Sequence, residues 1–252
     1  MIGREDVDGI AVLRMSAGKV NALDLELVRA ITAAFRELDG GPARGIVLTG
    51  GGRAFSAGVD LWRVVGGGAD YVREFLPALV ECFEAVFGTG KPVVAAVNGH
   101  AIAGGCVLAC ACDHRVMALG EGRIGVTELA VGVPFPVSAL EILAYAAGAE
   151  RARTAVLGAG TCAPPAAVPA GLVDEVVEPD ELISRAVEVA ARLAARIPAD
   201  TYRFTKQQLH AEVLERLARR RPAEDPGTTD LWLARLADGY IADYMRQVTA
   251  RP

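Results

Sequence analysis

Two glycine-containing loops hold backbone groups that are well placed for chemistry. The first is "TGGGRAFSAGVDL", Thr49 to Leu61, and the second is "AGGC", Ala103 to Cys106; each leads from an apolar stretch toward an expected helix start. The first N–H groups of a helix lack intrahelical acceptors and point outward. Two that converge can bind an oxyanion, and glycine lets a substrate carbonyl approach closely. Either loop alone is also typical of an ordinary turn, so only the pair is informative.

The composition is that of a globular protein without a nucleic-acid-binding surface. The 252 residues are 52% apolar and 23% charged, and the formal net charge is −5. Charges in "MIGREDVDGI" argue against a secretory signal. Five cysteines without a framework spacing indicate free thiols. We therefore expect a cytoplasmic protein.

The stretch from Pro92 to Cys112 has no charged residue and is long enough to span a membrane. Asn98–Gly99 and Gly104–Gly105 interrupt it, however, and such glycines mark breaks. Its first part, "PVVAAV", has the β-branched pattern of a buried strand. We expect a strand, a glycine loop and a buried helix, and no membrane partner.

Strands and helices alternate in the first part of the chain. The pattern predicts a hairpin that turns at Asp8–Gly9, a helix over 24–38, a strand over 44–50, and a long helix over 69–88 with a kink at Pro77. Beyond about Pro136 it predicts helices over 138–147, 152–158, 180–196, 201–219 and 229–246, with a strand-like segment at 172–178. Residues 219–230 look like a linker. The expected fold class is an α/β core with a mostly parallel sheet and a helical C-terminal layer.

The two loops and their surroundings resemble the enoyl-CoA hydratase/isomerase family, also called the crotonase family. "FSAGVDL" is followed by "KPVVAAVNGHAIAGGCVLACACDHRV", and the likeness covers most of residues 10–180. The resemblance implies a crotonase-like core of repeated ββα units over residues 1–180. It also implies a helical region over residues 181–252 that packs oligomers and covers the site.

The resemblance implies a binding site made of backbone. The family holds the thioester oxygen with two N–H groups, which here would be those of Val59 and Gly104. Lys19, Ala57, Val59 and Gly104 would line the coenzyme A path. Ala103 replaces the first glycine of the family motif, a mild departure because only the following N–H must reach the thioester. We interpret Asp60 as a cap of its loop.

The number of catalytic glutamates differs between the reactions of this family. Its hydratases carry one glutamate just after the glycine motif and a second in a later loop; this chain has Val107 and Glu128 at those positions. Water addition uses both carboxylates, and a valine can neither activate water nor transfer a proton. The sequence is similar to the one-glutamate 3-enoyl-CoA isomerases, which makes Glu128 the expected catalytic base beside the Val59 and Gly104 donors. On its own, Glu128 would be read as an exposed loop carboxylate or an ion-pair partner.

Two alternatives stay open at this point. One is another crotonase-type reaction, such as hydration or lyase or hydrolase chemistry. The other is a non-catalytic acyl-CoA-binding or assembly subunit. In each case the expected partner is an acyl-CoA thioester, with no separate cofactor, and the resemblance implies a homotrimer or hexamer. We interpret Arg219–Arg221 as a solvated helix end. The alternative is that these residues lie near the coenzyme A phosphates.

A metal site and a hydrolytic triad are not favoured. Cys106, Cys110 and Cys112 have the spacing C-x3-C-x-C, which matches neither common paired zinc pattern. We interpret them as buried core thiols. The histidines at 100, 114 and 210 accompany no nucleophile motif.

Overall fold

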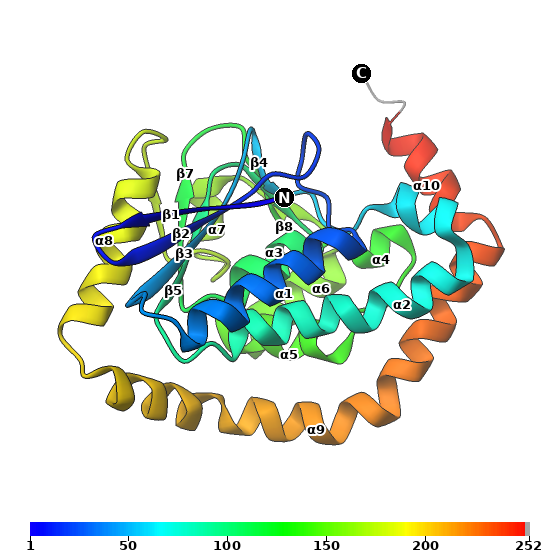
Figure 1. The fold of residues 1–252 in the computed structure, drawn as a ribbon. Helices are drawn as coiled ribbons and strands as arrows, with labels where there is room; N and C mark the ends of the chain where they lie inside the picture. The colour runs from blue at the N-terminus through cyan, green and yellow to red at the C-terminus, as the bar shows by residue number, and fades with distance from the viewer. Residues whose placement is uncertain (250–252) are drawn as a thin grey trace.

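The computed structural model describes residues 1–249, which form two β-sheets surrounded by helices (Figure 1). Within these residues the larger sheet has six strands: β1 (Ile2–Val7), β2 (Ile10–Met15), β3 (Gly45–Gly50), β5 (Val93–Val97), β7 (His114–Ala118) and β10 (Glu175–Val177). The smaller sheet has four: β4 (Ala54–Ser56), β6 (His100–Ile102), β8 (Ile124–Gly125) and β9 (Thr161–Cys162). The predicted C-terminal region reaches residue 252, and its last three residues lie outside the described part.

Helices fill the spaces between these strands and make up most of the second half of the chain. In order they are α1 (Leu25–Gly40), α2 (Leu61–Phe87), α3 (Gly104–Cys110), α4 (Glu128–Val131), α5 (Val137–Ala147), α6 (Ala149–Gly158), α7 (Pro164–Ala167), α8 (Leu182–Ala195), α9 (Ala199–Ala237) and α10 (Tyr240–Thr249). The predicted helix near 24–38 is confirmed as α1, which Asp24 caps by accepting a hydrogen bond from the Leu27 N–H.

The strand order confirms the predicted repeat of ββα units. β1 and β2 form the expected hairpin at Asp8–Gly9, and every later pair in the large sheet is parallel. Three successive units then follow one plan: β3–β4–α2, β5–β6–α3 and β7–β8–α4. In each unit the first strand joins the large sheet and the second joins the small one.

The large sheet is covered on both faces. Successive side chains of a strand point to opposite faces, and in β3 the side chains of Ile46 and Leu48 pack into the main core with α1 and α2. Val47 points the other way, toward Ala186 and Val189 of α8. Figure 1 shows α8 on one side of the sheet and α1 and α2 on the other.

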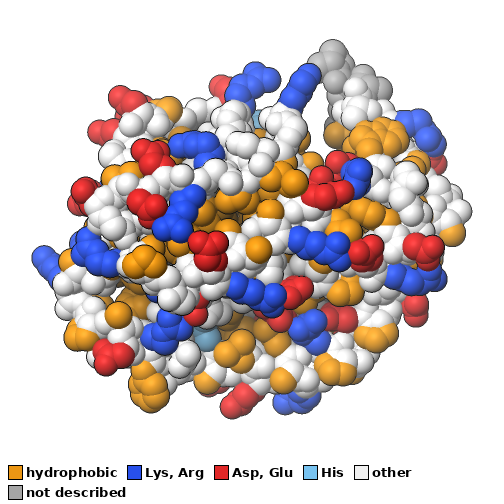
Figure 2. All heavy atoms as spheres, in the orientation of Figure 1, with side chains coloured by type: hydrophobic (Ala, Val, Ile, Leu, Met, Phe, Trp, Pro, Cys, Tyr) orange, Lys and Arg blue, Asp and Glu red, His pale blue; other side chains and the backbone are white. Residues whose placement is uncertain are grey.

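The uncharged stretch from Pro92 to Cys112 contains the expected strand and buried helix, but the segment expected as a glycine loop also forms a short strand. The whole stretch contains β5, β6 and α3, all of which lie in the core. Among the described residues, no helix is both long and apolar enough to cross a membrane. Figure 2 shows acidic and basic side chains interspersed over the face in view, without a broad basic patch on that face.

The break in the long helix α2 is at Gly68, so the prediction of a kink at Pro77 was wrong. Gly68 has φ 68° and ψ −159°, whereas Pro77 lies within continuous helix. Glycine adopts such a conformation without the steric penalty that a Cβ would bring. The three glycines at 66–68 therefore form the weak point, and the helix starts earlier than the apolar periodicity indicated.

The expected linker at 219–230 is also wrong, because these residues lie inside the single helix α9. Pro222 and Pro226 each remove a backbone N–H from this helix. Ion pairs to neighbouring helices hold the segment in place: Arg221 contacts Glu84 of α2 at 2.9 Å, and Arg220 contacts Glu141 of α5. These contacts link residues more than 70 positions apart, so no local pattern indicates them.

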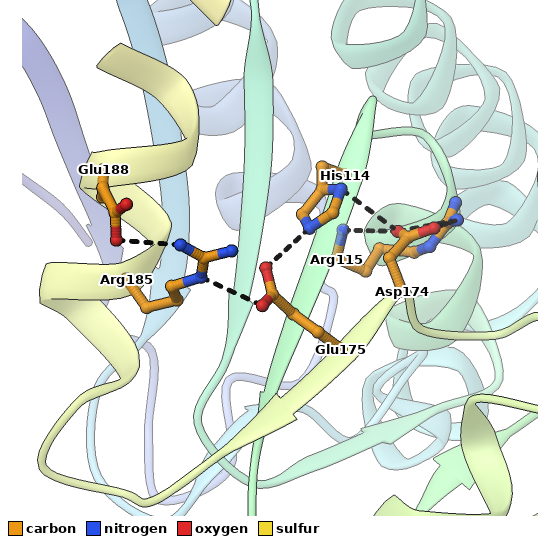
Figure 3. Close-up of polar contacts among 6 residues, drawn as sticks. All are labelled: His114, Arg115, Asp174, Glu175, Arg185 and Glu188. Atoms are coloured by element: carbon orange, nitrogen blue, oxygen red, sulfur yellow. Dashed lines mark hydrogen bonds and ion pairs between the residues drawn. The ribbon is translucent and has the colours of Figure 1, made fainter. Parts of the chain in front are cut away.

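The same contacts correct the interpretation of Arg219–Arg221 as a solvated helix end. Arg220 and Arg221 lie in the middle of α9, and both guanidinium groups bind carboxylates of other helices. A second set of ion pairs attaches α8 to the sheet edge: Arg185 of α8 contacts Glu175 of β10, which in turn contacts His114 of β7, each at 2.9 Å (Figure 3).

A buried ion pair joins α9 to the large sheet. The Lys206 Nζ lies 2.8 Å from Oδ2 of Asp113, and the two side chains are 6% and 17% exposed. The Val93 N–H and the Tyr202 hydroxyl also donate to this carboxylate.

We predict that Lys206→Met lowers the free energy of unfolding by about 3 kcal/mol, because it leaves the Asp113 carboxylate buried without its cation. Urea unfolding at neutral pH measures the change. The matched control is Arg36→Met, whose partner Glu81 is half exposed; this surface pair should contribute less than about 1 kcal/mol. Equal effects of the two substitutions would contradict the prediction.

Candidate active site

A cavity of about 430 Å³ lies where the loops after β4, β6 and β8 meet. Val59, Gly104 and Glu128 all line it, one from each loop. Because the three strands pair in parallel, their carboxyl ends lie at the same edge of the small sheet. The cavity therefore collects one predicted residue from each of three successive ββα units.

The backbone of Val59 presents a free donor to this cavity. The Leu23 N–H donates to the Gly58 carbonyl at 2.7 Å, and the Asp60 N–H donates to the Leu23 carbonyl at 3.0 Å. In this parallel bridge the intervening residue, Val59, turns its own N–H away from Leu23. In the described part of the chain, no backbone hydrogen bond uses the Val59 N–H.

The second donor is the N–H of Gly104, the first residue of α3. A first-turn N–H has no acceptor within its own helix. Ala103 precedes it with φ 52° and ψ −121°, a conformation that a residue with a side chain rarely adopts. The alanine that replaces glycine here therefore adds backbone strain, of about 1–3 kcal/mol, directly beside the donor.

The two loops touch at Gly58. This residue has φ +85°, and a Cβ added there would lie 2.7 Å from the Ile102 carbonyl oxygen and 3.5 Å from the Gly104 nitrogen. Only glycine fits such an approach without moving the second loop. The Val59 donor directly follows this contact, so the two donors are held on adjoining loops.

Glu128 is the buried acid of the cavity. It is 9% exposed, and its Oε2 has no hydrogen-bond partner among the described residues. Burial raises the pKa of the Glu128 carboxyl from its ordinary 4.5 to about 7, although the nearby N–H groups of Glu128 and Thr127 offset part of this effect. A carboxyl of this kind can both accept and return a proton near neutral pH.

The model of the enoyl-CoA hydratase/isomerase family matches residues 5–230. The chain belongs to this family. Mitochondrial enoyl-CoA delta isomerase 1 of Rattus norvegicus is 32% identical over 228 residues, which cover 89% of this chain and 78% of the relative. A putative enoyl-CoA hydratase of Thermus thermophilus is 36% identical over 195 residues, 76% of each chain.

A solved structure of the family has the same fold. The crystal structure of human mitochondrial delta3-delta2-enoyl-CoA isomerase superposes with a TM-score of 0.87 at 26% identity, over 99% of this chain and 97% of that one. Relatives with isomerase and hydratase names thus lie at similar identity. For this family member, the choice of reaction rests on the side chains in the cavity.

Two carboxylates line the cavity among the described residues, those of Asp60 and Glu128. Asp60 accepts a hydrogen bond from the Arg63 N–H at 3.0 Å and caps α2, which confirms its predicted role. Val107 of α3 is fully buried and contributes only apolar surface. Glu128 therefore differs from Asp60 in being buried, and its Oε2 has no hydrogen-bond partner among the described residues.

Of the residues predicted to line the coenzyme A path, only some line the cavity. Ala57 lines it, and the Ala57 N–H donates to the Val20 carbonyl at 3.0 Å. Lys19 is exposed and does not line the cavity, whereas its neighbour Val20 does. A role for Lys19 and Ala57 in binding coenzyme A stays a prediction.

Residues from the C-terminal helices also cover the cavity, and none of them was predicted as a site residue. Trp232 of α9 and three residues of α10 (Tyr244, Met245 and Val248) line it. Trp232 is 3% exposed, and its Nε1 donates to the Pro134 carbonyl at 3.1 Å. The available signal was a tryptophan in a polar stretch, one of only two in the chain.

The other residues singled out from the sequence lie away from the cavity. Cys106, Cys110 and Cys112 are buried, as predicted, and within the described residues no group of three or more potential ligands could hold a metal ion. The ring of His210 stacks on Phe87 with centroids 3.8 Å apart, and burial lowers its pKa to about 4.

We predict that Glu128→Gln stabilises the fold increasingly as the pH rises. Since the native carboxyl holds its proton up to about pH 7 while the unfolded chain releases it near 4.5, the wild type loses stability across this interval. The glutamine variant does not lose stability in this way, because its side chain carries no titrating proton. The difference in unfolding free energy between variant and wild type should grow by about 3 kcal/mol over the full interval, measured by urea unfolding between pH 5 and 8. Exposed Glu178→Gln is the control; an equal pH slope in both variants would count against a perturbed Glu128.

Proposed function

We propose that the protein moves the double bond of a 3-enoyl-CoA thioester to the 2-position, with Glu128 as the only base. The observation that carries this proposal is a cavity whose described wall holds one buried carboxyl group, that of Glu128, with an Oε2 that has no hydrogen-bond partner among the described residues. Glu128 lines the same cavity as the Val59 and Gly104 donors. This set of groups is sufficient for an isomerisation and insufficient for hydration.

The proposed reaction begins at C2 of the substrate. The thioester carbonyl acidifies the C2 proton, and the Glu128 carboxylate accepts it while electron density moves to the thioester oxygen. The N–H groups of Val59 and Gly104 donate to that oxygen and stabilise its charge. Glu128 then returns the proton to C4 and the double bond forms between C2 and C3. No water enters, and the base ends in its starting state.

Hydration of a 2-enoyl thioester is the competing proposal, since the Thermus thermophilus relative carries the name of a putative hydratase. Water addition needs one group to activate water and one to handle the proton at C2. Val107 offers neither. A purely binding role is less well supported, because an uncharged residue would fill the Glu128 position without the cost of burying a carboxylate.

We predict that kcat/KM for isomerisation exceeds that for hydration by at least about a hundredfold, the low end of one general acid–base contribution. Steady-state assays on 3-enoyl-CoA and 2-enoyl-CoA substrates of equal length measure both. Glu128→Gln should abolish isomerisation. Efficient hydration by the wild type that survives this substitution would refute the one-base mechanism.

A substitution at position 107 can supply the second carboxylate that hydration needs, and the same assay measures its effect. Val107→Glu should raise the hydration rate, whereas Val107→Gln, which has nearly the same shape and no acid, should not. Circular dichroism shows whether both variants fold. Equal hydration by the two would mean that a second carboxylate is not what this cavity lacks.

The backbone donor at Gly104 can be tested with a pair of variants. Gly104→Pro removes the N–H and should lower kcat by about 10² to 10³, while Gly104→Ala keeps the N–H and adds a comparable Cβ. That Cβ would meet the flexible end of Leu23 at 3.1 Å, so a modest loss is expected from alanine alone. If folded Gly104→Pro retained the activity of Gly104→Ala, Gly104 would not be an oxyanion donor.

A further inference from the structure

A second hollow lies directly behind the active-site cavity. This groove, of about 630 Å³, runs between α2 and α9 and is lined by Leu76, Val80, Leu217 and Ala218 among others. Pro136 lines both the groove and the cavity. The two spaces therefore adjoin at Pro136, and side chains of α2 and α9 form a layer beside it.

The layer is built from alternate faces of the same two helices. On α2, Leu76 and Val80 face the groove, while Leu79 and Phe83 face the cavity. On α9, Trp232 lines the cavity and Thr228, one turn earlier, lines the groove.

Trp232 is the one described α9 side chain that lines the cavity, and it is fixed in position. It is almost completely buried, and its Nε1 donates to the Pro134 carbonyl. Thr228 also donates to the neighbouring Phe135 carbonyl, at 3.4 Å. Two side-chain hydrogen bonds thus hold this turn of α9 against residues 134–135, so the indole cannot swing aside without losing one.

We propose that Trp232 closes the far end of the acyl-binding cavity and limits the substrate to short and medium acyl tails. This inference rests on the proposed function for the class of ligand, an acyl-CoA thioester. It adds that the tail ends at the indole of Trp232 and does not enter the groove. Trp232 is thereby a specificity-determining residue rather than a catalytic one.

The size of the cavity agrees with this limit. The thioester, the adjoining end of the pantetheine arm and the acyl tail would share about 430 Å³. The apolar wall of Leu79, Phe83 and Trp232 suits an apolar tail.

Binding of saturated acyl-CoA thioesters tests the limit without depending on which reaction occurs. Isothermal titration calorimetry is run with butanoyl-, octanoyl- and dodecanoyl-CoA, each below the concentration at which it forms micelles. The wild type should bind octanoyl-CoA more tightly than butanoyl-CoA, because added methylenes are buried. It should bind dodecanoyl-CoA at least tenfold more weakly than octanoyl-CoA.

Trp232→Ala and the milder Trp232→Phe should open the cavity into the groove. Dodecanoyl-CoA should then gain at least tenfold in affinity relative to octanoyl-CoA in the alanine variant, and less in the phenylalanine variant. Ala218→Trp, at an exposed position that lines only the groove, is the matched control. Alone it should leave the wild-type profile unchanged, and combined with either Trp232 variant it should remove the gain.

Each other outcome counts against the inference. If the wild type binds dodecanoyl-CoA as tightly as octanoyl-CoA, or if Ala218→Trp alone weakens dodecanoyl-CoA, the tail already reaches the groove. If folded Trp232→Phe and Trp232→Ala keep the wild-type ratio, Trp232 does not set the limit. If no thioester binds at all, the proposed function fails and this inference fails with it, whereas a lost length limit with intact binding overturns this inference alone.

Discussion

The active-site cavity depends on the parallel pairing of three very short strands, β4, β6 and β8. Each strand contributes only two or three residues, yet together they set the distance between the loops that follow. The approach is so close that position 58 cannot carry a side chain without displacing the next loop. The N–H groups of Val59 and Gly104, the proposed oxyanion donors, therefore lie on adjoining loops that follow paired strands. A backbone N–H at position 59 does not depend on the type of side chain there.

Buried carboxylates elsewhere in the molecule have ion-pair partners, whereas the one in the cavity does not. The buried carboxylate of Glu141 binds Arg216 and Arg220, and that of Asp113 binds Lys206. These pairs join helices and sheet, so each charge has a structural role. Glu128 has no cation within ion-pairing distance among the described residues, and its proton is held by desolvation alone. The fold thus buries one carboxyl group without an ion-pair partner among the described residues, and it is the group proposed as the base.

Features that depend on local sequence could be predicted, and features that depend on distant contacts could not. The glycine loops, the helix near residues 24–38 and the alternation of strands and helices follow from residues close together in the chain, whereas the ββα repeat was implied by the family resemblance. The continuity of α9 through two prolines depends on ion pairs with α2 and α5, which no window of residues reveals. Trp232 was missed for the same reason, because its hydrogen-bond partner Pro134 is 98 positions away.

The position of α9 also has a consequence for the order of events during synthesis. The cavity-lining residues from Val59 to Glu128 leave the ribosome well before Trp232 and α10, which cover them. Domains fold while the chain is being made, so the apolar cavity wall is exposed in the nascent chain for the time needed to add about a hundred residues at about 5–20 residues per second.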